Sequence, residues 1–152
     1  MLKQQQAPMP LFAAAHVLAW LAFLFLVSWP NFYSGFTETA VSPGETAVEA
    51  ERVTASLIEV NGYRIVFLLL IPVIVSGVAL FSVYAELKLG ARIGFTVWAA
   101  AFTLMLFAGI GSVTIGIFYL PGALTLLVAA VIRQRRRQAQ KRPPRQREET
   151  WR

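Results

Sequence analysis

The sequence contains no cysteine and no aspartate, and His16 is its single histidine. Without cysteine the chain cannot form disulfide bonds, thiolate metal sites, iron–sulfur clusters or a thiol-redox centre. A single histidine cannot supply two axial ligands to a haem. The motifs of phosphate-binding loops, zinc proteases and serine hydrolases are also absent. We therefore predict that the protein is not an enzyme and holds no cofactor and no metal ion.

Charged residues are scarce, at 14% of the chain, and they are unevenly placed. Three runs carry no Asp, Glu, Lys or Arg at all: residues 4–37, 65–85 and 93–132. A soluble domain places charges on the wet face of each helix and strand, so this distribution argues against a soluble fold. It predicts a multi-pass membrane protein instead.

About 20 apolar residues are needed to cross a bilayer as a helix. Residues 11–29 and 64–84 each match one span. The run 93–132 would make a helix of about 60 Å, so it must fold back, and Gly109–Ser112 is the place near its middle with turn residues. The prediction is an all-α membrane domain over residues 1–132, whose third and fourth spans cover 93–109 and 112–132. The first span lacks a cleavage site and is predicted to stay as an anchor.

Lysine and arginine in short loops set the orientation of such a protein. Lys3, Lys88, Arg92 and the end of the chain are basic, whereas the loop 30–63 holds five glutamates and one arginine. Four spans place every basic segment on one side of the membrane, and three spans do not. We expect both termini in the cytoplasm and the loop 30–63 outside.

The outer loop contains two local signals. Ser42–Glu45 is typical of a capping box, with a serine N-cap and a glutamate at N3. Residues 56–60 could continue a helix or run extended. Asn61–Gly62 fits a hairpin turn, a helix stop or a cap for the second span, and we favour the cap because the apolar run begins within four residues. The loop is then either a linker or a small element that docks a partner.

Three residues inside the spans are candidates for function. His16 is titratable, and ionisable groups in a membrane are often functional. Pro72 and Pro121 would each free a carbonyl one turn earlier, at Leu68 and Ile117, and such carbonyls can line a path for ions or solutes. The plainer interpretations are a hydrogen-bonded histidine and prolines of the kind common in membrane helices. Small residues spaced four apart, such as Ala15 and Ala19, predict close packing within the bundle first and between copies second.

The segment 133–152 is predicted to be a disordered, basic cytoplasmic tail. Eight basic residues within it lie close together, with no acidic residue among them before Glu148. Such clusters bind anionic lipid headgroups, and the absence of interleaved aromatic residues argues against nucleic acid. The candidate lipid-binding residues are Arg133, Arg135, Arg136, Arg137, Lys141, Arg142, Arg145 and Arg147.

Two stretches, 116–127 (GIFYLPGALTLL) and 56–62 (SLIEVNG), resemble small bacterial four-span membrane proteins of unknown function. The resemblance implies a bacterial inner-membrane location and no particular activity. Small multidrug transporters, vitamin K epoxide reductase-like enzymes and membrane glutathione transferases fit worse, because their intramembrane glutamate, cysteine or arginine residues are missing here. The leading hypothesis is a non-catalytic accessory protein, scaffold or small complex subunit. The alternative is an oligomeric channel or carrier for a small solute.

Overall fold

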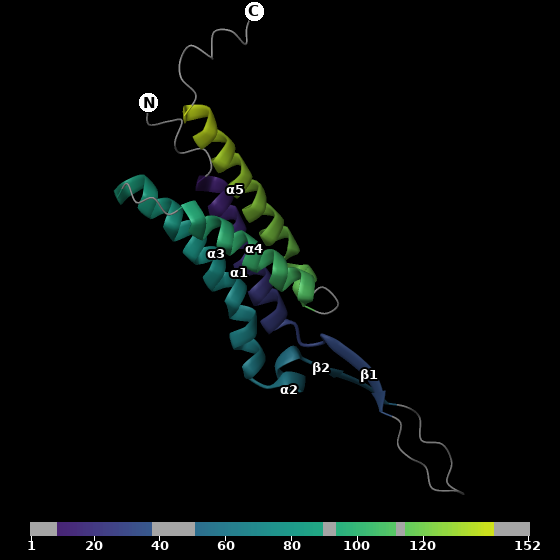
Figure 1. Ribbon diagram of the computed structural model, residues 1–152. Coiled ribbons are helices and arrows are strands. Elements are labelled where there is room, and N and C mark those ends of the chain that lie inside the picture. Colours follow the sequence, from purple (N-terminus) through teal and green to yellow (C-terminus); the bar gives the residue numbers. More distant parts are fainter. Residues whose placement is uncertain (1–8, 38–50, 90–93, 112–114, 142–152) are drawn as a thin grey trace, which may run out of the picture.

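The computed structural model describes residues 9–37, 51–89, 94–111 and 115–141 (Figure 1). Four long helices form a bundle, and a β-hairpin with a short helix extends from one end of it. The elements in chain order are α1 (Met9–Ser28), β1 (Tyr33–Thr37), β2 (Glu51–Ala55), α2 (Leu57–Asn61), α3 (Arg64–Leu89), α4 (Gly94–Ile110), the 3-10 helix η2 (Gly116–Tyr119) and α5 (Leu120–Lys141).

Three of the helices in the described part of the chain are long and apolar enough to cross a bilayer: α1, α3 and the continuous segment Gly116–Ala139. Helix α4 is shorter, with 17 residues, and is also apolar. Large apolar side chains such as Phe67, Phe81 and Phe102 face outward, whereas alanines fill much of the core. Water would disfavour so much exposed apolar surface. Long apolar helices with large apolar side chains on the outer surface are typical of a helical membrane protein, as predicted.

The bundle is an up-and-down arrangement in which α1 packs against α3 and α5, and α4 packs against the same two helices. Small residues lie where α1 and α5 meet. A Cβ atom on Gly122 of α5 would lie 3.4 Å from the Ala15 carbonyl oxygen of α1, and Ala15 and Ala19 are both buried. The predicted packing role of this alanine pair is therefore confirmed.

Two helices extend beyond the predicted spans at the same end of the bundle (Figure 1). Helix α3 continues past Tyr84 to Leu89, and α5 continues through residues 133–141, which were expected to be disordered. That expectation is wrong for this part of the tail. Hydropathy locates the point where a helix leaves the apolar layer, but a helix ends only where its backbone hydrogen bonding ends. Here both helices carry charged side chains that pair with each other.

The connection between α4 and α5 lies where the sequence predicted it, since α4 ends at Ile110. The following span begins later than residue 112, with η2 at Gly116. The backbone N–H of Gly116 donates to the Gly111 carbonyl oxygen at 2.6 Å. A Cβ on Gly116 would lie 2.5 Å from the Ala108 carbonyl oxygen. The chain therefore reverses through a close backbone approach that only glycine permits.

The segment 30–63 contains structure that sequence patterns did not reveal. Strands β1 and β2 pair antiparallel, with Tyr33 opposite Ala55 and Thr37 opposite Glu51. The chain is therefore not purely α-helical. The predicted capping box Ser42–Glu45 lies outside the described residues.

Residues 56–61, which sequence left undecided between helix and strand, form a short capped helix. Ser56 caps α2, and Glu59 completes a capping box with it. Hydrogen bonding with Ser56, chiefly from the Ser56 backbone N–H to the Glu59 carboxylate, lowers the pKa of Glu59. Gly62 ends α2 with a φ of 68°, a value that favours glycine. The favoured role of Asn61 as a cap for the second span is wrong, because its side chain bonds back to the Leu57 carbonyl.

Candidate functional site

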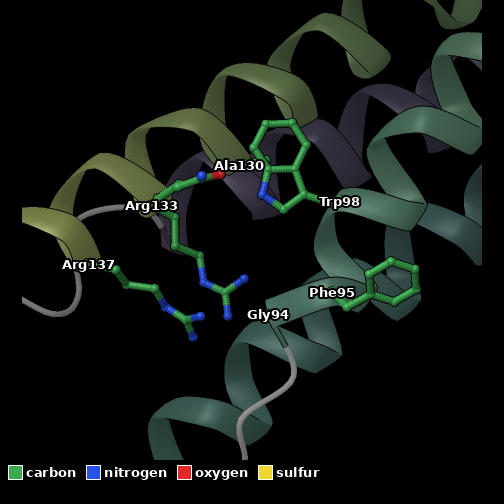
Figure 2. A pocket seen from close by; sticks show the side chains of 7 residues that line it. Gly94, Phe95, Trp98, Ala130, Arg133 and Arg137 are labelled. Carbon is green, nitrogen blue, oxygen red and sulfur yellow. The ribbon is translucent and has the colours of Figure 1, made fainter.

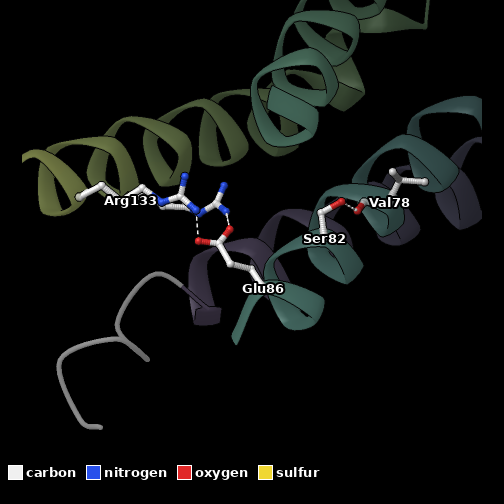
Figure 3. Close-up of polar contacts among 5 residues, drawn as sticks. Val78, Ser82, Glu86 and Arg133 are labelled. Atoms are coloured by element: carbon white, nitrogen blue, oxygen red, sulfur yellow. Dashed lines mark hydrogen bonds and ion pairs between the residues drawn. The ribbon is translucent and has the colours of Figure 1, made fainter. Parts of the chain in front are cut away.

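The strongest polar cluster in the described chain lies at the end of the bundle where α3 and α5 extend. Glu86 of α3 forms ion pairs with Arg133 and Arg137 of α5, one through each carboxylate oxygen (Figure 3). The two arginines are four residues apart, so they lie on one face of the helix. Arg133 is buried, and the Arg137 side chain is 40% exposed. One carboxylate thus meets two guanidinium groups, which leaves a net positive charge.

A pocket of about 250 Å³ adjoins this cluster between α4 and α5 (Figure 2). Figure 2 shows both guanidinium groups pointing toward its Gly94 side. A Cβ on Gly94 would lie 2.8 Å from Nη1 of Arg137, so the arginine reaches the first residue of α4. None of the lining residues that the structure describes is acidic. The lining residues are Gly94, Phe95, Trp98, Ala130, Arg133, Gln134 and Arg137.

His16, the predicted intramembrane candidate, has a bond at each ring nitrogen. Its Nδ1 lies 2.9 Å from Oγ of Ser76, and the indole N–H of Trp20 donates to its Nε2 at 3.1 Å. The Ser76 hydroxyl donates to the Val73 carbonyl. Because indole only donates, Nε2 is the acceptor in the bond with Trp20. The structure therefore supports the plainer interpretation, a hydrogen-bonded histidine that joins α1 to α3.

The two prolines do not lie in equivalent surroundings. Pro72 is buried within α3, and nearby the Tyr119 hydroxyl donates to the Leu69 carbonyl at 2.8 Å. Pro121 is the second residue of α5, so its missing N–H falls in the first turn, where no intrahelical partner is required. The Ile117 carbonyl accepts from the Leu120 N–H. The expectation that Pro121 frees this carbonyl is wrong, because η2 changes the bonding there.

Of the five predicted lipid-binding residues that the structure describes, Arg133 and Arg137 line the pocket. Arg135 and Arg136 lie exposed on α5, and Lys141 is its last residue. Arg142, Arg145 and Arg147 lie outside the described residues.

The sequence patterns assign no role to Glu86, which lies two residues past the predicted end of the second span. The available signal was the four-residue spacing of Arg133 and Arg137, which indicates two cations on one helical face and hence a shared anion. Their partner lies 47 and 51 positions earlier, a separation that no local pattern reports. Trp98 and Gly94 were also missed as pocket residues, because neither carries a distinctive motif.

Comparison with protein-family models, with curated proteins and with solved structures finds no match to the chain.

Proposed function

We propose that the chain is a non-catalytic, four-span subunit or scaffold of a bacterial inner membrane that docks a partner through the hairpin β1–β2. The observation that carries the proposal is the position of the hairpin. It extends away from the end of the bundle (Figure 1), and among the described residues no third strand pairs with it.

An isolated two-stranded hairpin is only marginally stable in water. The outer edges of its strands present unpaired N–H and C=O groups, which readily accept a further strand. Both faces of this hairpin are accessible, since Ser34, Val53 and Thr54 are exposed. The partner that fits such an edge is a protein that supplies an extended segment.

The base of the hairpin is held firmly, which favours a docking element over a loose linker. Leu57 of α2 is buried in a cluster with Leu26 and Tyr119, and Phe32 packs against the same cluster. The capping box of α2 fixes the direction of the chain directly after β2. The bundle therefore presents the strands in one orientation, which reduces the entropy lost on binding.

We expect a photo-crosslinking residue at Ser34 or Thr54 to yield one discrete adduct with a partner protein in intact cells. The two positions lie opposite each other in the hairpin. The matched control is Phe81, which is 68% exposed on the outer surface of α3 and should contact lipid. Gel shifts followed by mass spectrometry would identify the adducts. An adduct of the protein with itself would favour a homo-oligomer, and adducts only at Phe81 would contradict docking through the hairpin.

The proposed orientation places the hairpin outside and the Glu86 end of the bundle in the cytoplasm. It rests on the basic residues that gather at that end. Because the chain has no cysteine, single cysteines at Ser34 and Lys88, both exposed, give a clean test. A membrane-impermeant maleimide should label the first in intact cells and the second only after permeabilisation. The reverse pattern would contradict the orientation.

A channel or carrier remains the alternative from sequence, and no geometry of the described residues favours it. The polar side chains in the core bond within the bundle rather than facing an open path. His16 bonds to Ser76, and the hydroxyl groups of Ser76 and Tyr119 donate to backbone carbonyls of α3. Solute flux into proteoliposomes that contain the purified protein would support the alternative.

A further inference from the structure

We propose that the pocket between α4 and α5 binds the phosphate group of one anionic phospholipid. This inference goes beyond the proposed docking role, and it requires only that the protein resides in a membrane. It assigns Arg133 and Arg137 to a defined site between helices, rather than to a diffuse basic tail.

The charges around the pocket favour an anion. Glu86 supplies one negative charge to two guanidinium groups. Each guanidinium has five N–H donors, and each ion pair is made through Nη2. Arg137 also approaches Gly94, the first residue of α4, where the helix dipole adds partial positive charge. A phosphate oxygen in this space would relieve the repulsion between these groups and accept charge-assisted hydrogen bonds.

The pocket lies where the apolar surface of the bundle gives way to polar surface, which is the level of lipid headgroups. On α5, Val128 is exposed and apolar, whereas Gln134 and Arg135 are exposed and polar. Trp98 lines the pocket from α4, and tryptophan is enriched at the boundary between membrane and water. An anion bound here would therefore be at the depth of a phospholipid phosphate.

The wall on the α4 side favours a lipid over a free phosphate ion. Phe95 lines the pocket and is 84% exposed. Trp98 stacks obliquely with Phe102 one turn further along, with 5.9 Å between the ring centroids, and Phe102 is 63% exposed. These rings form an apolar track that leads from the pocket along the membrane-facing side of α4. An acyl chain attached to the bound phosphate could lie along this track.

Native mass spectrometry of the full-length chain in a neutral detergent would test the site. A neutral micelle has no surface potential, so binding there reports the pocket itself. Delipidated protein would be titrated with phosphatidylglycerol and with phosphatidylcholine of the same acyl chains. We expect one tightly bound phosphatidylglycerol per chain and weaker binding of phosphatidylcholine. Arg137→Gln should weaken the binding of phosphatidylglycerol about tenfold, because it removes a charged donor from the site.

Arg135→Gln is the matched control, since it removes the same charge from an exposed position on the same helix that is not among the residues lining the pocket. It should change the affinity by no more than about twofold. Gly94→Ala provides a second variant that keeps every charge. Its methyl group would displace the Arg137 guanidinium, and it should weaken binding in the same direction as Arg137→Gln. If Arg137→Gln fails to fold, the binding of phosphatidylglycerol by Gly94→Ala tests the proposal instead.

The proposal would be overturned by equal losses in Arg137→Gln and Arg135→Gln, by equal binding of the two lipids, or by undiminished binding in Gly94→Ala. Inorganic phosphate and glycerol 3-phosphate at millimolar concentration distinguish the source of the anion. Neither should displace the lipid, because neither has an acyl chain to lie along Phe95 and Phe102. Full displacement by phosphate would assign the pocket to a free anion instead.

Discussion

Gly116→Ala is expected to lower the free energy of unfolding by about 3 kcal/mol or more, at the upper end of the range for overpacked sites. The added Cβ would lie 2.5 Å from the Ala108 carbonyl oxygen and from the Gly111 carbonyl carbon. Both are backbone atoms, so no side-chain rotation can relieve the clash. The reversal between α4 and η2 would have to open, which would break the hydrogen bond from Gly116 to Gly111.

Gly109→Ala is the matched control for this prediction. Gly109 lies in the last turns of α4, and a Cβ there would meet nothing within 4 Å. Alanine is favoured over glycine in helices by about 0.5–1 kcal/mol, so this variant should be unchanged or slightly more stable. Unfolding by a denaturing detergent, followed by the retained helical signal, would measure both variants. Equal stability of the two would show that the turn does not depend on the close approach of Gly116.

The four helices of the bundle could be predicted from hydropathy because each must cover its apolar residues with lipid or with other helices. The predicted span 93–109 nearly coincides with α4 (Gly94–Ile110). The ends of α3 and α5 could not be predicted in the same way. Glu86 and Arg133 interrupt the apolar pattern, yet their helices continue, because the charges meet each other between the helices.

The hairpin could not be predicted because its strands show no strict alternation of apolar and polar residues. Strand β1 (Tyr33–Thr37) contains a central glycine, and β2 (Glu51–Ala55) begins with two charged residues. Their pairing depends on contacts across a separation of up to 22 residues. For the same reason the pocket could be predicted only in part: the arginines were identified as lipid-binding candidates, whereas Glu86, Gly94 and Trp98 acquire a role only from the packing of three helices.

Glu86→Gln is expected to destabilise the protein by about 2 kcal/mol. Breaking a fully buried ion pair costs about 3–5 kcal/mol, and the partial exposure of Glu86 and Arg137 reduces that figure. The neutral amide would leave the two guanidinium groups of Arg133 and Arg137 facing each other, with Arg133 buried. The extended ends of α3 and α5 would then separate or fray. Denaturing-detergent unfolding of the variant and the wild type would measure the loss.

A charge-matched control and a double variant separate the ion pair from a general effect of net charge. Glu59→Gln removes the same charge from an exposed residue of α2. Glutamine also serves at this position of a capping box, so this variant should lose far less stability than Glu86→Gln. Arg133→Leu in the Glu86→Gln background removes the buried cation that has lost its partner, so it should restore part of the lost stability. A Glu86→Gln protein as stable as Glu59→Gln would mean that the pair contributes nothing to the bundle. Absence of recovery in the double variant would mean that Arg133 is held by contacts other than Glu86.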